Sequence, residues 1–329
     1  MARFCIAFTV AAASWLHITV APAAQNAGSV PAYPTRPIRI VVGFTPGGQP
    51  DITARAIAVK LTEVLRQQVV VDNRPGAGGT LGTKIVAEAN PDGHTLLSVS
   101  ASHAIQPAVY EKLPYDTLRD FAGITTTASS SYMLVVPVSL PVKSVQDLIA
   151  LAKAKPGQLN FGSAGNGSGT HFAAELLKST AQVDVVHVPY KGIPEALTDT
   201  IAGRVQFFMT PPVTLGTMVK DGKVRALGVT GRRRVRSYPD VPTIAEAGVS
   251  GFVWESWAGL LAPARTPREV VMKLNREITA ILKMPDIQQR FVGLGTEPTP
   301  STPAEFDKLI ASELKRVAEL ARKAGITPQ

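Results

Sequence analysis

The stretch that decides the fold is Ile38-Arg39-Ile40-Val41-Val42, followed directly by Gly43-Phe44-Thr45-Pro46-Gly47-Gly48-Gln49-Pro50-Asp51. The first part is a mostly apolar run, which is typical of a strand buried in a parallel sheet. The second part is a turn rich in glycine and proline, and apolar residues then recur at helical spacing from Ala54 to Leu65. A strand, a turn and an amphipathic helix make the first unit of an α/β fold.

The same alternation continues along the chain. Further strands are expected at residues 69–71, 96–99, 132–136, 159–161, 185–188, 205–209 and 224–229. Strands separated by helices imply a mainly parallel sheet that is covered on both faces. Capping residues predict helix starts at Ser144 to Asp147, at Thr266 to Glu269 and at Thr302 to Glu305, because a hydroxyl residue stands three positions before an acidic one.

Composition and charge restrict the class of protein. The chain has 329 residues, of which 45% are hydrophobic and 18% charged, so a globular protein with a sizeable core is expected. Long disorder, collagen and coiled coil are excluded. Lys and Arg number 34 against 25 Asp and Glu, which gives a formal net charge of +9. Such a surplus attracts nucleic acid, anionic lipid or anionic small molecules, and composition does not choose among them.

The N-terminus has the pattern of a secretory signal peptide at residues 1–23. Arg3 is the only charge before Arg36, the following residues are mostly apolar, and Ala21-Pro22-Ala23 fits the small-x-small rule for cleavage. A buried N-terminal helix and a membrane anchor are the alternatives, although the apolar run is short for a membrane span. Export carries a protein away from the cell's nucleic acid, so no nucleic-acid partner is expected.

Two glycine-rich loops are candidates for ligand binding. The first is residues 43–51, and the second is Gly162-Ser163-Ala164-Gly165-Asn166-Gly167-Ser168-Gly169-Thr170-His171. Each follows a strand and begins a helix, where free backbone N–H groups and the helix dipole favour an anion. The structural alternative is two ordinary turns with Ser168 as a plain N-cap. Ligands of open α/β sheets bind at such carboxyl ends of strands, so the pair favours a binding site.

Motifs for catalysis and for cofactors are weak. No G-x-S-x-G elbow surrounds Ser163 or Ser168, and the histidines outside the signal show no metal-ligand spacing. Cleavage of the signal also removes Cys5, the only cysteine. Neither a metal nor another cofactor is therefore expected. Ser168 and His171 as nucleophile and base are the enzymatic alternative, which lacks an identifiable orienting acid.

Two further segments are read as structural. The run from Arg232 to Arg236 is either a polyanion patch or a solvated loop edge, and the second is favoured because no aromatic residues interleave with it. A third glycine cluster, residues 73–82, misses the spacing of a dinucleotide loop. We predict a turn there, with Arg74 in a salt bridge.

A series of short motifs resembles the Bug family of periplasmic solute-binding proteins, the receptors of tripartite tricarboxylate transporters. The matching stretches run from about Tyr33 to Gly325. They include Tyr33-Pro34-Thr35-Arg36-Pro37-Ile38, Asn73-Arg74-Pro75-Gly76-Ala77-Gly78-Gly79, His187-Val188-Pro189-Tyr190-Lys191-Gly192 and Pro239-Asp240-Val241-Pro242-Thr243. Each motif alone is weak, but their number and order make the resemblance specific.

The resemblance implies a two-domain α/β fold of the periplasmic-binding-protein type II, or Venus flytrap, with parallel-rich sheets and crossing hinge strands. Domain 1 would comprise residues 33–126 and 251–329, and domain 2 residues 127–250. The protein would be a periplasmic monomer and not an enzyme. It would capture a small carboxylate by domain closure and deliver it to the membrane subunits of a tripartite tricarboxylate transporter. A ligand-sensing receptor for a membrane signalling protein is the alternative, and a periplasmic esterase is less favoured.

The same resemblance places the ligand between the two glycine-rich loops. The expected ligand contacts are Phe44, Gly47, Gly48, Asp51, Ser102, Ser163, Asn166, Gly167, Ser168, His171 and Thr210. Backbone N–H groups and Ser168 would hold a carboxylate, whereas Asp51 would cap the helix, order water or meet a cationic group. Departures from the family pattern at Gln49-Pro50, at His94 and at Thr210-Pro211-Pro212 leave the ligand's identity open.

Overall fold

The computed structural model describes residues 1–2, 33–323 and 325–328. The predicted signal peptide falls almost entirely outside these described residues. Pro34–Gln329 is one compact unit, and the description below concerns this unit alone. No helix in the described part of the chain combines the length and the apolar character that a membrane crossing needs.

The first sheet has six strands in the order β11-β4-β10-β3-β1-β2. β1 (Ile38–Val42) pairs in parallel with β2 (Val69–Asn73) and β3 (Thr95–Ser100). β10 (Glu255–Pro263) runs antiparallel to β3 and β4 (Phe121–Ser131), and β11 (Glu297–Pro298) forms the edge. The apolar side chains of β1 are fully buried, which confirms the predicted buried strand.

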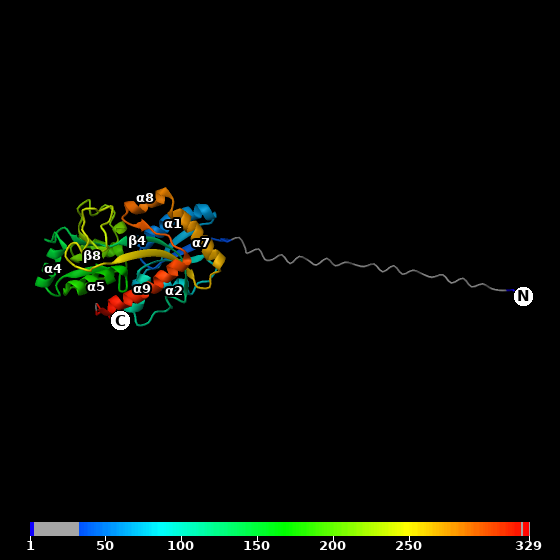
Figure 1. Ribbon diagram of the computed structural model, residues 1–329, viewed down its shortest axis with the longest axis horizontal. Coiled ribbons are helices and arrows are strands. Elements are labelled where there is room, and N and C mark those ends of the chain that lie inside the picture. Colours follow the sequence, from blue (N-terminus) through cyan, green and yellow to red (C-terminus); the bar gives the residue numbers. More distant parts are fainter. Residues whose placement is uncertain (3–32, 324, 329) are drawn as a thin grey trace. The chain divides into compact units, whose positions relative to one another are not determined.

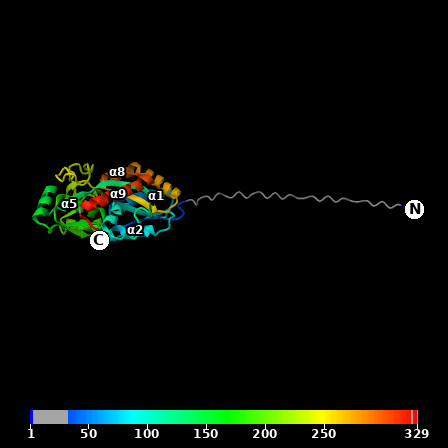
Figure 2. The ribbon, with the colours of Figure 1, turned by 60° about the horizontal axis from the view of Figure 1, so that its bottom comes forward.

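Helices cover both faces of this sheet. They are α1 (Gln49–Leu65), α2 (Thr80–Ala87), α3 (Ser102–Val109), α7 (Arg268–Leu282), α8 (Pro285–Gly293) and α9 (Pro303–Lys323). Figures 1 and 2 show α1 and α8 on one side of the sheet and α2 on the other. We call the six-stranded sheet and these helices the first lobe.

The second sheet has five strands in the order β7-β6-β8-β5-β9. β6 (Asn160–Ser163) pairs in parallel with β7 (Val186–Pro189) and β8 (Phe207–Thr210). β5 (Met133–Pro137) runs antiparallel to β8 and β9 (Val224–Val229). With α4 (Val145–Ala154), α5 (Gly169–Ala181) and α6 (Ile193–Ile201) this sheet makes the second lobe.

The chain crosses between the lobes on adjacent strands. Only Tyr132 separates β4 of the first sheet from β5 of the second. Thr230 lies at the return crossing: its Oγ1 accepts from the backbone N–H of Tyr132 at 2.8 Å, and its own N–H donates to the Tyr132 carbonyl at 2.8 Å. The Trp254 N–H then donates to the Thr230 carbonyl at 2.8 Å, directly before β10 begins. These bonds hold the two crossing segments side by side.

The predicted helix caps have different outcomes. Ser144 and Asp147 form a capping box at α4, and Thr302 and Glu305 do the same at α9, as expected. The prediction for Thr266 is wrong. α7 begins at Arg268 with the extended Pro267 as its N-cap, so the start is shifted past the threonine and no side-chain cap forms.

The buried core extends through both lobes. One cluster includes Val41 and Leu97 of the first sheet together with Leu134 and Phe161 of the second. A second cluster, on α6 and the strands beneath it, receives Phe44 against its surface. The ring of Phe44 comes from the first glycine-rich loop, so this loop packs onto the second lobe.

Candidate functional site

A small cavity lies where the two glycine-rich loops meet. Its volume is about 30 Å³, and α1 begins on it at residues 48–50 while α5 begins on it at residues 168–170. The lining residues are Phe44, Gly48, Gln49, Pro50, Ser100, Tyr132, Ala164, Ser168, Gly169, Thr170, Ile193 and Pro211. A water molecule needs about 10–15 Å³, so the cavity holds about two. A whole dicarboxylic acid therefore needs more space than this arrangement of the two loops leaves.

The helix starts give this cavity a positive potential without a cation. All of its lining residues are uncharged. Gly48 is the N-cap of α1 and has no side chain that could cap the helix. The first backbone N–H groups of this 17-residue helix are therefore not bonded to a capping side chain. α5 has 13 residues and contributes a second N-terminus from the other lobe. Two helix dipoles with their positive ends at one cavity favour a bound anion.

Two pairs of hydroxyl groups add donors to this cavity. Ser168 Oγ and Thr170 Oγ1 lie 2.9 Å apart, and both already accept from backbone N–H groups. Ser100 Oγ and Ser102 Oγ lie 3.0 Å apart. Within each pair one hydroxyl donates to the other, so one hydroxyl hydrogen remains available. Ser102, an expected ligand contact, thus lies behind Ser100, which lines the cavity.

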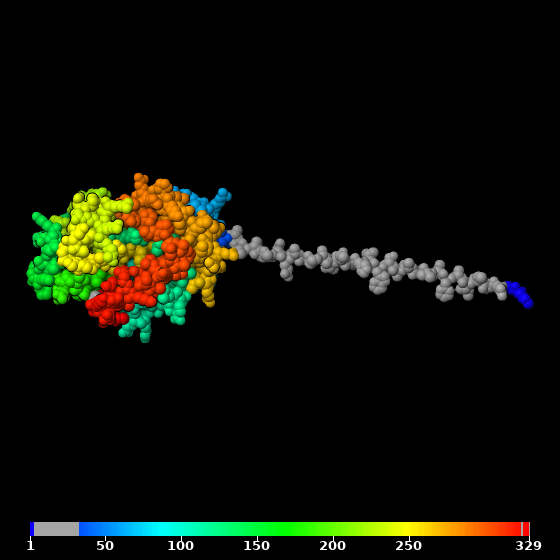
Figure 3. Space-filling model, in the orientation of Figure 1, coloured from blue at the N-terminus to red at the C-terminus, as the bar shows by residue number. Residues whose placement is uncertain are grey.

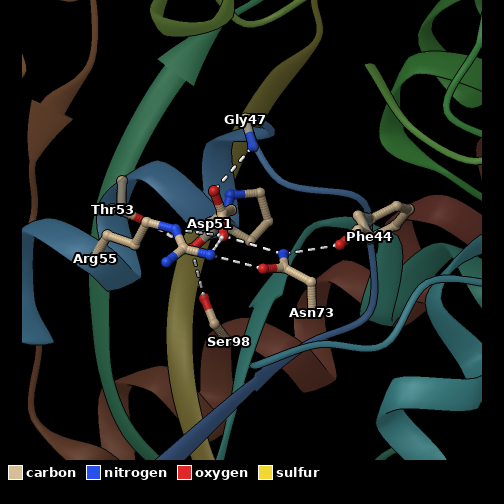
Figure 4. A network of polar contacts seen from close by, with 8 residues as sticks. Phe44, Gly47, Asp51, Thr53, Arg55, Asn73 and Ser98 are labelled. Carbon is tan, nitrogen blue, oxygen red and sulfur yellow. Dashed lines mark hydrogen bonds and ion pairs between the residues drawn. The ribbon is translucent and has the colours of Figure 1, made fainter. Parts of the chain in front are cut away.

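Asp51 lies behind the first loop and does not line the cavity (Figure 4). Its Oδ2 accepts from the Gly47 N–H at 2.8 Å, and its Oδ1 accepts from Asn73 Nδ2 and Arg55 Nε at 3.0 Å each. Asn73 Nδ2 also donates to the Phe44 carbonyl at 3.0 Å. The buried carboxylate therefore fixes the shape of the loop from behind, and the guanidinium of Arg55 balances its charge.

Neutral histidines support the second loop. Ser163 Oγ is bonded to His187 Nε2 at 2.6 Å and accepts from the Gly165 N–H at 3.0 Å. The His171 ring stacks on His187 with ring centroids 4.2 Å apart, and its Nδ1 accepts from the Gly167 N–H at 3.4 Å. Burial lowers the pKa of His171 to about 4. Burial, and then the neighbouring His171 and Lys178, lower the pKa of His187 to about 3.

The enzymatic alternative for the second loop gains no support from these contacts. Ser168 Oγ accepts from the backbone N–H of His171, not from its ring. Ser163 and His187 have the separation of a nucleophile and a base, but Ser163 is fully buried and its oxygen already accepts a backbone bond. A buried hydroxyl held in this way positions the loop.

Direct contacts hold the lobes together beside the cavity. The Asn166 carbonyl accepts from the Tyr110 hydroxyl at 2.9 Å, and Thr45 Oγ1 donates to Glu195 Oε2 at 3.1 Å. Each bond joins one lobe to the other. Asn166 and Gly167, two expected ligand contacts, thus lie at the junction of the lobes, since Gly167 packs on Val109 and Tyr110.

The third glycine cluster is part of this junction, which the sequence did not indicate. It forms the short 3-10 helix η1 (Ala77–Gly79), and the predicted salt bridge of Arg74 is present, to Asp72 at 3.0 Å. A Cβ added at Gly78 would lie 1.9 Å from the carbonyl oxygen of Asn166. Gly78 and Asn166 are 88 positions apart in the sequence, so their close approach arises from the tertiary fold and no local sequence pattern reveals it.

The remaining predicted residues divide into two groups. Phe44, Gly48 and Ser168 line the cavity. Thr210 is fully buried next to the lining residue Pro211, and its hydroxyl is 2.7 Å from that of Thr214. The lining residues that sequence reasoning missed include Ser100, Tyr132 and Thr170, of which Ser100 had a signal: it ends a strand at the edge where ligands bind.

Other candidate sites differ in character. Among the described residues, no group of three or more His, Cys, Asp or Glu side chains is placed to hold a metal ion. The exposed run Arg232 to Arg236 lines an open cleft of about 330 Å³ together with Glu297 and neighbouring residues. Figure 3 shows this part of the surface in yellow, beside the orange of α8. Arg234 is paired with Glu246 at 2.9 Å, and Arg236 with Glu297 at 3.6 Å.

Comparison with known proteins agrees with this geometry. The family described as "Tripartite tricarboxylate transporter family receptor" matches residues 53–326. The chain belongs to this family. A UPF0065 protein from Pseudomonas sp. (strain P51) is 39% identical to it, and the alignment covers 92% of this chain and 90% of the relative. The resemblance to the Bug family is therefore confirmed.

Solved structures of family members confirm the two-domain fold. "R. palustris Rpa4515 with adipate" has a TM-score of 0.88 and 35% identity, covering 90% of this chain and all of that one. The periplasmic binding protein BugD has a TM-score of 0.87 and 32% identity, and the match covers 90% of this chain and 100% of BugD. MatC from Rhodopseudomonas palustris with bound malate has a TM-score of 0.84 and 32% identity, and the match covers 88% of this chain and 99% of MatC. These relatives are solute-binding proteins, and members of the family are periplasmic receptors.

Proposed function

We propose that this receptor binds one small carboxylate between its two lobes in the periplasm and delivers it to a tripartite tricarboxylate-type membrane transporter. Family membership and the relatives that hold adipate and malate support the carboxylate as ligand. The leader pattern at residues 1–23 supports export. The protein acts by binding alone, as a monomer, without a cofactor and without catalysis.

One observation carries the proposal: α1 and α5, from different lobes, begin at the same uncharged cavity. A carboxylate placed there accepts hydrogen bonds from backbone N–H groups of both helix starts and from the spare hydroxyls of the Ser100–Ser102 and Ser168–Thr170 pairs. Because the donors come from both lobes, the anion stabilises the closed arrangement over an open one. Ligand binding and closure are thereby coupled.

The contacts beside the cavity complete this cycle. The Tyr110–Asn166 and Thr45–Glu195 bonds form only when the lobes meet. An empty receptor opens at the crossing strands and exposes the two helix starts, and a bound acid draws them together. The transporter then distinguishes the loaded receptor by its closed surface.

Titration calorimetry of the chain without residues 1–23 tests the proposal. The panel contains acetate, succinate, malate, adipate, citrate and benzoate, with succinamide as an uncharged control. We expect saturable binding of at least one acid at one site per chain, and none of succinamide. An acid at 100 times its dissociation constant should stabilise the fold by about 2.7 kcal/mol. Absence of binding and of any thermal shift across the panel would contradict the proposal.

A second measurement addresses delivery to the transporter. Uptake of the radiolabelled acid that binds most tightly is measured in cells with and without this receptor. We expect uptake to be lost without the receptor and restored by the wild-type chain. Unchanged uptake would contradict the transport role while leaving binding intact.

A further inference from the structure

Gln49 has a side-chain carbonyl that the fold leaves without a partner. The residue is 1% exposed and lines the cavity between the lobes. Its Oε1 is buried and accepts no hydrogen bond within the described part of the chain. Buried acceptors without a partner are uncommon, because the group has lost its water without replacing it. An orphaned acceptor on a residue that lines a binding cavity therefore needs an explanation.

The opposite side of the amide is fixed by β4 and by the residue before β11. Gln49 Nε2 donates to Ser130 Oγ at 3.0 Å and to Thr296 Oγ1 at 3.4 Å. The Thr296 hydroxyl gives its own hydrogen to the Ser129 carbonyl at 2.9 Å, so its oxygen can only accept from Gln49. Rotation of the amide by 180° would set the Gln49 carbonyl against the Thr296 oxygen. The nitrogen is therefore held at this contact, and the carbonyl remains without a partner.

The carbonyl has the opposite character to the other polar groups that a ligand meets there. The helix starts and the two hydroxyl pairs offer hydrogens, which suit a carboxylate. Gln49 Oε1 offers a lone pair, which suits an O–H or N–H group. The lining contains no carboxylate that would stabilise an ammonium group, so a neutral donor is favoured over a charged amine.

We propose that Gln49 makes the receptor selective for small carboxylates that also carry a hydroxyl group, which donates to its Oε1. This inference rests on the proposed function, and it names the ligand class of the same cavity. A plain acid of equal length, bound between the lobes, leaves the carbonyl unpaired. Sites built to pair with a hydroxyl discriminate strongly against the analogue that lacks it, for this reason.

Matched pairs of acids test the inference by calorimetry. The pairs are succinate with malate and glutarate with 2-hydroxyglutarate, each enantiomer being measured, and aspartate is the charged-amine comparison. We expect the better enantiomer of at least one hydroxy acid to bind at least about tenfold more tightly than its plain partner. Aspartate should bind more weakly than malate. The ratio in the wild-type protein tests the inference even where a variant does not fold.

Variants then assign the preference to one atom. Gln49→Met keeps the length of the side chain and removes the acceptor, so the ratio between the affinities for hydroxy acid and plain acid should fall to about one. Gln68→Met is the control, because Gln68 is exposed beyond the far end of α1, and its ratio should equal that of the wild type. Thermal unfolding of each variant without ligand checks that it is folded.

The outcomes separate the two proposals. Equal affinity for both members of each pair in the wild type overturns the selectivity and leaves the carboxylate receptor standing. A preference that survives in Gln49→Met also overturns the role of Gln49. If no acid of either kind binds, the proposed function and the selectivity are both contradicted.

Discussion

The two glycine-rich loops meet at one cavity but are supported by different chemistry. Behind the first loop lies a charged network, in which the Asp51 carboxylate is bonded to Arg55, Asn73 and the Gly47 N–H. Behind the second loop lie neutral, stacked rings, those of His171 and His187. The first helix start has a glycine N-cap without a side-chain bond, whereas the second has a serine that caps it.

The difference shows how a fold presents backbone donors without placing a charge among them. In both loops the titratable groups lie behind the backbone, and the cavity wall is uncharged. A cation in the wall would bind an anion strongly but would also carry its own desolvation cost. Helix starts give a weaker field that is fixed in direction, so the supporting groups set the geometry. The variants below remove those groups one at a time.

The largest expected effect is the response of the second loop to acid. The folded protein keeps His171 and His187 neutral, with pKa values of about 4 and about 3, against 6.5 in the unfolded chain. Above pH 6.5 both states are neutral and stability is complete. As the pH falls from 6.5 towards 4, only the unfolded chain binds protons, so stability falls. A displacement from 6.5 to about 4 corresponds to about 3 kcal/mol for His171 alone.

Urea denaturation between pH 7.5 and 4 measures this loss. In His187→Gln the amide can still bond to Ser163, but the group no longer titrates, so the slope of stability against pH should be shallower. A slope equal to that of the wild type would contradict the role of the histidine stack.

The next effect concerns closure of the second loop on the first lobe. In Gly78→Ala the new methyl group would lie 1.9 Å from the Asn166 carbonyl oxygen, which prevents the lobes from meeting. We expect the affinity for the acid to fall about 100-fold, equivalent to about 2.7 kcal/mol. Gly222→Ala is the matched control, because its φ of +65° is close to the +61° of Gly78 and nothing lies within 4 Å. Equal affinities of the two variants, measured by calorimetry, would contradict the closure contact.

The charged network of the first loop should have an intermediate effect. Asp51→Ala leaves the Gly47 N–H without its acceptor and Asn73 Nδ2 with the Phe44 carbonyl alone, so we expect unfolding to become easier by about 2 kcal/mol. Affinity should fall in parallel, because the loop loses its shape. Arg55→Met should cost less than about 1 kcal/mol, since the Arg55 side chain is 49% exposed. Chemical denaturation ranks the two variants, and the reverse order would be inconsistent with a carboxylate that organises the loop.

The smallest effect is expected for the cap of the second helix. Ser168→Ala removes one side-chain cap and one hydroxyl of the cavity wall, so stability should fall by about 1 kcal/mol. The affinity should fall by about fivefold to tenfold, because one donor is lost while the backbone N–H groups remain. Calorimetry measures the change in affinity, and thermal unfolding measures the change in stability. An unchanged affinity would show that Ser168 serves the helix alone.

The sequence predicts both glycine-rich loops and many of the strands, because each is a local pattern, but it does not predict the two longest strands, β4 and β10. The apolar run of β1 and the capping boxes at Ser144 and Thr302 involve neighbours within four positions, and all are confirmed. The cap at Thr266 fails for a local reason as well: the extended Pro267 takes the N-cap position and the helix begins after it.

The cavity is harder to predict, because its wall is assembled from distant segments. The two loops were identified by their glycines, but sequence does not show that Asp51 and His171 lie behind their loops. Gly78 gains its role only from Asn166 in the other lobe. The unusual Gln49 was noticed as a departure from the family pattern, yet its orphaned carbonyl depends on hydroxyls 81 and 247 positions away.

A crystal structure of the protein grown with its tightest-binding acid from the panel tests the central claim directly. The account predicts one carboxylate of that acid between the starts of α1 and α5, with oxygens about 3 Å from the backbone nitrogen of Gly48, Gln49 or Asp51 and from the hydroxyl of Ser168 or Thr170. An acid bound to one lobe only, or seated among Arg232 to Arg236, would contradict it.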